Sequence, residues 1–265
     1  MELYDIIGTP DEKPLDRIVS DGGFVGIFRT IACVGDSLAS GEFEVKDPKT
    51  GEWMHLDRYE YSWGQFLGRM AGSKVYNFSK CGMTAKEYMT SYANRQGFWN
   101  PALRADAYVI GLGVNDLLNR KWELGEISDV CVEDYTKNKE TFIGYYAAII
   151  QKYKTIAPDA HFFLITFPKG GKSESENRVV EKAIEAIYAL AEMFDNTYVI
   201  DLNKYGVEYN AEWGKLFKLN GHLNAAGYMY NAKVICSYMD YIIRHNLEKF
   251  KTVGISEFEY DRDFV

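Results

Sequence analysis

Short apolar runs alternate with longer segments of helical periodicity along most of the chain. Five apolar runs have the length and composition of buried strands, at residues 30–34, 74–78, 107–111, 161–166 and 197–201. Three segments repeat apolar residues at helical spacing, at residues 135–156, 175–194 and 224–247. Strands that alternate with helices are typical of βαβ units. The pattern predicts an α/β fold, a three-layer α/β/α sandwich around a mainly parallel five-stranded sheet.

The two ends of the chain and one internal segment depart from this rhythm. We predict an N-terminal arm at 1–29, one domain at 30–251, and a tail at 252–265 that is packed on the domain or flexible. The acidic stretch 257–263 is expected to be a solvated face. Residues 42–57 are polar and contain Pro48 and Gly51, which predicts an inserted loop overhanging a site. The N-terminal arm is compatible with a homo-oligomer.

Composition narrows the class of protein. A chain of 265 residues with 47% hydrophobic content is long enough for one large core. The net charge of -8 disfavours nucleic acid and anionic membrane surfaces as partners. The first 18 residues lack the basic and apolar regions of a signal peptide, and no later stretch has the length of a membrane span. We therefore expect a cytoplasmic protein.

Cysteines and histidines are few. The cysteines are scattered without a CxxC pair, which argues against a zinc site and a disulfide scaffold. Cys33 and Cys81 are expected to be buried small residues, and no metal or organic cofactor is expected. A catalytic base near neutral pH is usually a histidine. The candidates are His55, His161, His222 and His245.

Ser37 follows the first predicted strand, at the carboxyl end where open parallel sheets form their sites. A serine at a strand-to-helix turn can present its hydroxyl beside free backbone N–H groups, which suits attack on an ester carbonyl. The alternative is that Asp36 and Ser37 only cap a helix. A G-x-S-x-G elbow is absent because position 39 is Ala39, and Asp116 stands where a dinucleotide motif would need its third glycine.

Four segments together resemble the conserved blocks of the GDSL/SGNH hydrolases. The first is Gly35-Asp36-Ser37-Leu38 followed by Ala39-Ser40-Gly41. The others follow in the family's order, at residues 77–84 (NFSKCGMT), 111–116 (GLGVND) and 222–228 (HLNAAGY). The blocks extend over residues 31–228, about three quarters of the chain. The resemblance implies the flavodoxin-like SGNH hydrolase fold.

The resemblance also implies site residues. The backbone N–H groups of Ser37 and Gly82 and the side chain of Asn115 would form an oxyanion hole, with Gly82 allowing close approach of the backbone. His222 would take the proton from Ser37 and return it to the leaving alcohol. Alternatively, Asn115 is a helix N-cap, and His222 is a surface residue that caps the helix near Asn224.

Three aspartates are given supporting or structural roles. Asp36 and Asp116 are expected to accept turn-stabilising hydrogen bonds. Asp201, at the end of the last predicted strand, is not assigned to the triad.

One position departs from the family's pattern. The family carries an aspartate three residues before the histidine, where this chain has Leu219. Such a carboxylate fixes the histidine tautomer and stabilises the imidazolium. A backbone carbonyl, Asn220, or a distant carboxylate such as Glu208 or Glu212 would have to replace it, and the sequence leaves these alternatives open.

The expected activity is a two-step acyl transfer through an acyl-enzyme on Ser37. A small-molecule ester is the expected partner, with a short acyl group, acetyl being favoured, on a carbohydrate-like alcohol. A long-chain lipase is disfavoured because the sequence shows no amphipathic membrane-docking helix. The alternatives are a catalytically silent ligand-binding protein and a thioesterase or transacylase. Aromatic residues that would either stack on sugar rings or anchor the core or the predicted loop are Trp53, Tyr59, Tyr61 and Trp63.

Overall fold

The computed structural model of the chain describes residues 2–255 and 258–259. Its central sheet has five parallel strands in the order β4-β1-β5-β6-β7. The strands are β1 (Thr30–Gly35), β4 (Lys74–Ser79), β5 (Ala107–Gly111), β6 (His161–Ile165) and β7 (Thr197–Ile200). Each lies within one residue of its predicted bounds, so the predicted fold is confirmed. Most of the acidic stretch 257–263 lies outside the described residues.

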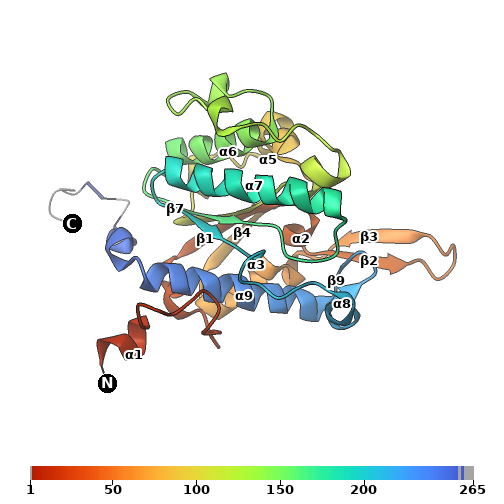
Figure 1. Cartoon of the computed structure of the whole chain (residues 1–265), viewed down its shortest axis with the longest axis horizontal. Helices are drawn as coiled ribbons and strands as arrows, with labels where there is room; N and C mark the ends of the chain where they lie inside the picture. The colour runs from red at the N-terminus through yellow and green to blue at the C-terminus, as the bar shows by residue number, and fades with distance from the viewer. Residues whose placement is uncertain (1, 256–257, 260–265) are drawn as a thin grey trace.

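Helices cover both faces of the sheet (Figure 1). Ile31 and Cys33 of β1 pack toward one face and Ala32 and Val34 toward the other, as the alternation of a strand requires. The first face is covered by α3 (Trp63–Ala71) and α9 (Ala225–Arg244). The second is covered by α6 (Phe142–Ile156) and α7 (Glu174–Met193), with the short helices α4 (Ala85–Glu87) and α5 (Ala93–Gln96) beside them.

Capping residues set the helix boundaries. Helix α6 begins at Phe142, seven residues later than predicted, because the Thr141 hydroxyl accepts the N–H of Gly144 and ends the preceding loop. Helix α7 begins after a reciprocal pair of hydrogen bonds between Ser173 and Glu176. Short 3₁₀ turns lie at Gly23–Ile27, Tyr59–Tyr61, Pro101–Leu103, Ile127–Asp129, Tyr135–Lys137 and Leu247–Phe250, and π turns at Tyr88–Tyr92 and Val114–Asn119.

The segment 42–57 is a β-hairpin, and its prediction as a loop was wrong. Strands β2 (Glu42–Lys46) and β3 (Trp53–Asp57) pair antiparallel. The sequence of β2 alternates polar and apolar residues with a period of two, and its buried side chains are Glu42 and Glu44, whereas all of β3 is exposed. Pro48 and Gly51 occupy only the turn. The hairpin projects from the body of the domain (Figure 1).

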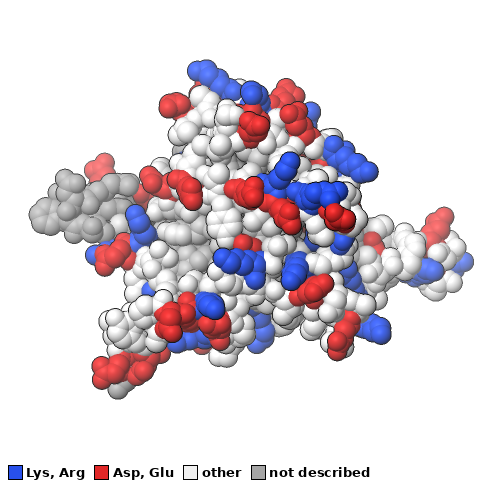
Figure 2. Space-filling model, in the orientation of Figure 1, with Lys and Arg blue, Asp and Glu red and all other residues white. Residues whose placement is uncertain are grey.

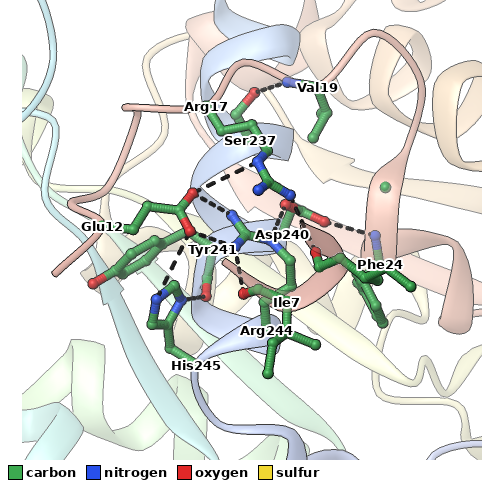
Figure 3. A network of polar contacts seen from close by, with 12 residues as sticks. Ile7, Glu12, Arg17, Val19, Phe24, Ser237, Asp240, Tyr241, Arg244 and His245 are labelled. Atoms are coloured by element: carbon green, nitrogen blue, oxygen red, sulfur yellow. Dashed lines mark hydrogen bonds and ion pairs between the residues drawn. The ribbon is translucent and has the colours of Figure 1, made fainter. Parts of the chain in front are cut away.

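The N-terminal segment is fastened to α9 by a buried polar network (Figure 3). The segment contains α1 (Leu3–Ile7). The Arg244 guanidinium donates to both oxygens of Glu12, at 2.6 and 2.8 Å, and to Asp240 Oδ2 at 2.7 Å. Asp240 Oδ1 in turn accepts the backbone N–H of Phe24 at 2.8 Å. We call Glu12, Asp240 and Arg244 the N-terminal clamp.

Charged side chains of both signs are interspersed over the face shown in Figure 2. In the part of the chain that the structure describes, no helix combines the length and hydropathy needed to cross a bilayer.

Candidate active site

Three neighbouring strands end side by side, and three of the predicted site residues follow these ends. In the sheet register Gly35 of β1 is aligned with Ser79 of β4 and Gly111 of β5. Ser37, Gly82 and Asn115 follow these positions by two, three and four residues. The chain places β4 on one side of β1 and β5 on the other, so the strand order reverses at β1. Open α/β sheets bind ligands at the carboxyl ends of the strands where this reversal occurs.

Ser37 is the first residue of the short helix α2 (Ser37–Ser40). The Asp36 carboxylate caps this helix by accepting the N–H of Leu38 at 3.1 Å. The N–H of a first helical residue has no intrahelical acceptor. Ser37 is partly exposed, and its hydroxyl makes no hydrogen bond with the described residues. Both the hydroxyl and the N–H are therefore available to a ligand.

Asn115 joins the loops that follow β1 and β4. Its side-chain N–H₂ donates to the Met83 carbonyl at 3.1 Å and lies 3.4 Å from Asp36 Oδ2. Gly82 has a φ of +70°, and a Cβ built there would meet no atom within 4 Å, so its backbone borders open space. Gly113, not Asn115, occupies the N-cap of the turn that follows β5, so the N-cap alternative for Asn115 is wrong.

Two buried aspartates hold the turns around these residues. Burial raises the pKa of Asp36 to about 6, although the hydrogen bond from Leu38 and the charge of His222 act in the opposite direction. Asp116 accepts the N–H of Ala85 at 2.9 Å, and burial raises its pKa to about 7. Asp36 thus supports the loop of Ser37, and Asp116 supports the loop of Gly82.

His222 lies in a short strand that contacts α2. It begins β9 (His222–Leu223), which pairs with β8 (Lys218–Leu219) after α8 (Ala211–Phe217), and β9 contacts α2. Asn224 caps α9 by accepting the N–H of Gly227, so the alternative that His222 caps this helix is wrong. No hydrogen bond joins Ser37 to His222 among the described contacts. Such bonds are often long in unliganded enzymes and shorten when substrate binds.

Glu44 of the hairpin is the hydrogen-bond partner of His222. His222 Nδ1 lies 2.8 Å from Glu44 Oε1. Glu44 Oε2 accepts hydrogen bonds from the Asn220 side chain at 2.5 Å and from the Gly221 N–H at 2.8 Å. Burial raises the pKa of Glu44, but the hydrogen bonds from Gly221, His222 and Asn220 outweigh this effect and the net pKa is lowered.

The sequence interpretation missed this partner. It considered Glu208 and Glu212, and neither contacts His222 in the described part of the chain. Asn220 binds Glu44 and not the imidazole. The alternating Glu-Phe-Glu of residues 42–44 is the signal that would have indicated a strand with two carboxylates on one face.

Glu42 and His55 form a second histidine–carboxylate pair next to the first. Glu42 has no exposed surface; its Oε1 lies 2.5 Å from His55 Nδ1, and its Oε2 accepts no hydrogen bond from the described residues. His222 Nε2 is 3.7 Å from that Oε2. We call Glu42, Glu44, His55 and His222 the hairpin cluster.

The hairpin cluster is a group whose donor atoms could surround a metal ion. One ligand atom from each of its four residues lies within 4.8 Å of the others. In the structure, however, both Nδ1 atoms are already hydrogen-bonded to carboxylates. The observed contacts are therefore those of two histidine–carboxylate pairs.

The cysteines and the other histidines contribute no nucleophile or base here. Cys33 is buried as predicted, but Cys81 is exposed, which corrects its prediction. Burial of its thiol and the neighbouring Glu42 raise the pKa of Cys81 to about 12, so it is protonated at neutral pH. His161 is buried in a stack with Phe250, and His245 binds backbone carbonyls near the clamp.

An apolar cavity of about 70 Å³ adjoins α2. Leu38 and Ala39 of α2 border it, together with Phe167 and Ile235 from other elements. Trp63 also borders it and is buried, so of its two predicted roles the structure excludes sugar stacking and agrees with a core anchor. Trp53, Tyr59 and Tyr61 are exposed.

The geometry supports nucleophilic chemistry on a carbonyl. A free hydroxyl lies at a helix N-terminus, in loops that also carry Gly82, whose Cβ position borders open space, and the amide of Asn115, which donates to the Met83 carbonyl. An imidazole held by a carboxylate lies against the same helix. These parts correspond to a nucleophile, an anion-binding group and a base.

Comparisons with known proteins identify the family of the chain. Residues 33–230 match the model of the GDSL-like lipase/acylhydrolase family. No curated protein sequence matches the chain.

Solved structures with similar folds include carbohydrate esterases. A family two carbohydrate esterase from Clostridium thermocellum in complex with cellohexaose superposes with a TM-score of 0.54 and 16% identity, over 90% of this chain and 66% of that one. A family 3 carbohydrate esterase from Clostridium thermocellum superposes with a TM-score of 0.50 and 15% identity, over 82% and 97% of the two chains. At these identities the likeness concerns the fold.

Proposed function

The chain belongs to the GDSL-like lipase/acylhydrolase family, and from this premise we propose that it is a serine esterase that removes short acyl groups through Ser37. The observation that carries the proposal is the convergence of Ser37, Gly82 and Asn115 at three adjacent strand ends, with His222 against the helix that Ser37 begins. Membership of the family supports an esterase or acylhydrolase in general. The acyl group, the alcohol and the residue roles belong to the proposal.

In the first step the Ser37 hydroxyl attacks the ester carbonyl and transfers its proton to His222 Nε2. The carbonyl oxygen becomes an oxyanion that accepts hydrogen bonds from the N–H groups of Ser37 and Gly82 and from the Asn115 amide. His222 then donates the proton to the departing alcohol. In the second step water attacks the acyl-Ser37 ester with His222 again acting as the base, and the carboxylic acid leaves.

The cavity beside α2 supports a short acyl group by its size; Ser37 does not border it, but its neighbours Asp36 and Leu38 do. Its volume of about 70 Å³ is less than half of the roughly 150 Å³ of an engineered cavity that holds benzene. The residues around it are mostly apolar, as an acyl methyl group requires. An acetyl or propionyl group therefore suits the cavity better than a long chain.

A carbohydrate-like alcohol is favoured by exposed aromatic rings near the hairpin. Trp53, Tyr59 and Tyr61 offer flat apolar surfaces to solvent, of the kind on which sugar rings stack. Similarly folded proteins include carbohydrate esterases, one of them solved with cellohexaose. A small-molecule ester, without nucleic acid or membrane as a partner, is consistent with the net charge of -8.

The proposal is tested by hydrolysis of p-nitrophenyl acetate, butyrate and octanoate, followed by O-acetylated sugars. We expect the purified protein to cleave acetate fastest and Ser37→Ala to lose the activity, while Ser20→Ala, at an exposed serine, keeps it. Acetyl-CoA as an alternative substrate distinguishes a thioesterase. Equal rates for the wild type and Ser37→Ala on every ester would contradict the proposal and favour a ligand-binding protein.

A further inference from the structure

We propose that Glu44 is the carboxylate that orients His222, supplied by the hairpin β2–β3 in place of the residue three positions before the histidine. This inference rests on the proposed function, because it assigns a positioning residue to the same reaction. It answers the question raised by Leu219, whose apolar side chain cannot accept a hydrogen bond.

The contact fixes the orientation of the imidazole. With Nδ1 donating to Glu44 Oε1 at 2.8 Å, the proton of the neutral ring resides on Nδ1 and the lone pair on Nε2. A base that takes a proton from Ser37 needs this tautomer. When Nε2 accepts the proton, the Glu44 carboxylate faces the positive ring and stabilises it without itself being protonated.

Glu44 is itself held by the turn that carries His222. Its Oε2 accepts hydrogen bonds from Asn220 and Gly221, the two residues directly before the histidine, while its Oε1 contacts the ring. One carboxylate thus spans the turn and the imidazole. The arrangement ties the position of the hairpin to that of the base, although the two are 178 residues apart in the chain.

The neighbouring pair keeps Glu44 available to His222. His55 is directly opposite Glu44 in the hairpin register, yet its Nδ1 contacts Glu42 at 2.5 Å and lies 3.7 Å from Glu44. Each histidine therefore has its own carboxylate. The titratable groups that face His222 are Asp36, which caps α2, Glu42 and Glu44 from β2, and His55 from β3.

The test compares Glu44→Gln with Glu52→Gln, the same substitution at an exposed position of the same hairpin. Glutamine keeps the shape of the side chain but removes its charge, and its amide can donate to Nδ1 and impose the wrong tautomer. We expect kcat for p-nitrophenyl acetate to fall by about 10²- to 10⁴-fold, with KM changed by less than about twofold. Glu52→Gln should match the wild type.

Two further readouts separate orientation from a structural role. Glu44→Asp retains the charge on a shorter side chain and should recover part of kcat. In proton NMR spectra the low-field signal of the His222 Nδ1–H, identified by its loss in His222→Gln, should also be lost in Glu44→Gln. Activity that requires a divalent metal and disappears with EDTA would assign the hairpin cluster to metal binding and overturn the inference.

The possible failures are distinguishable. A folded Glu44→Gln protein with wild-type kcat contradicts the role of Glu44 and leaves Ser37 as the nucleophile. A wild type as inert as Ser37→Ala contradicts the proposed function and the catalytic role of Glu44 together. In that case loss of the NMR signal in Glu44→Gln would assign the Glu44–His222 pair to structure alone.

Discussion

Two buried groups of carboxylates in this molecule differ in how their charge is balanced. In the N-terminal clamp, Glu12 and Asp240 share the Arg244 guanidinium, and all four carboxylate oxygens lie against a donor. In the hairpin cluster, the ionisable partners of Glu42 and Glu44 are histidines, and Glu44 also accepts hydrogen bonds from Asn220 and Gly221. One oxygen of the fully buried Glu42 accepts no hydrogen bond from the described residues.

This difference in charge balance suggests that one group of carboxylates serves stability and the other serves catalysis. A guanidinium is always charged, so the clamp has one protonation state and fastens two parts of the chain. An imidazole gains and loses a proton near neutral pH, so the hairpin cluster can change its charge during a reaction. A buried carboxylate with an unpaired oxygen costs stability and is more often found at functional sites. We therefore expect the clamp to govern unfolding and the hairpin cluster to govern activity.

The largest effect is expected from His222→Gln. Loss of the base should reduce kcat/KM by about 10⁴-fold or more. Glu44 keeps its hydrogen bonds from Asn220 and Gly221, so the free energy of unfolding should change little. Ester hydrolysis and urea denaturation measure the two quantities. His245→Gln, a histidine beside the clamp, is the control and should keep full activity.

The reciprocal change is Arg244→Met in the clamp. It leaves the buried Asp240 without its cation and Glu12 with only the more distant Arg17 and His245, which should lower the free energy of unfolding by about 3 to 5 kcal/mol. The folded variant should retain wild-type kcat/KM at 25 °C. Arg178→Met breaks an exposed ion pair with Glu174 and should cost only about 0.3 to 0.5 kcal/mol. A clamp variant that is stable but inactive would remove the distinction between the two regions.

Asn115→Ala examines the anion-binding part of the site. Loss of the amide donor should lower kcat by about 10²- to 10³-fold, with a smaller effect on KM. The exposed Asn94→Ala is the matched control. An Asn115→Ala protein with wild-type kcat would show that the oxyanion is bound elsewhere.

The smallest effect concerns the pH dependence of stability. Burial raises the pKa of Asp116 from 3.8 to about 7, so the folded protein holds a proton between these values that the unfolded chain releases. Stability from this group is therefore present at low pH and is lost as pH rises toward 7. Asp116→Asn mimics the protonated side chain, and urea denaturation should find it more stable than wild type at pH 8. The difference should vanish near pH 4; a constant difference would contradict the shift.

The sheet was predictable from the sequence because apolar runs alternate regularly with segments of helical periodicity. Strands buried on both faces appear as continuous apolar runs, and all five were found within one residue of their observed bounds. Ser37, Gly82 and Asn115 were predictable because each follows such a run, and parallel strands place their carboxyl ends together. The start of α6 was missed because Thr141 caps a helix within a pattern that continues upstream.

The partner of His222 was not predictable from local pattern. Glu44 lies 178 residues from the histidine, and their contact depends on how the hairpin packs against β9. Residues 42–57 were predicted to be a loop because they contain Pro48 and Gly51, although these two residues form only the turn of the hairpin. The sequence left open whether Trp63 binds sugars or anchors the core, and its position at the start of α3 places it in the core.

The central claim is that Ser37 is an activated nucleophile, and covalent labelling tests it most directly. A fluorophosphonate phosphonylates an activated serine with loss of fluoride, and peptide mass spectrometry locates the adduct. We predict a single adduct on Ser37 in the wild type, strongly slowed labelling in His222→Gln, and none in Ser37→Ala. A wild type that stays unlabelled, or an adduct at another residue that persists in Ser37→Ala, would contradict the account.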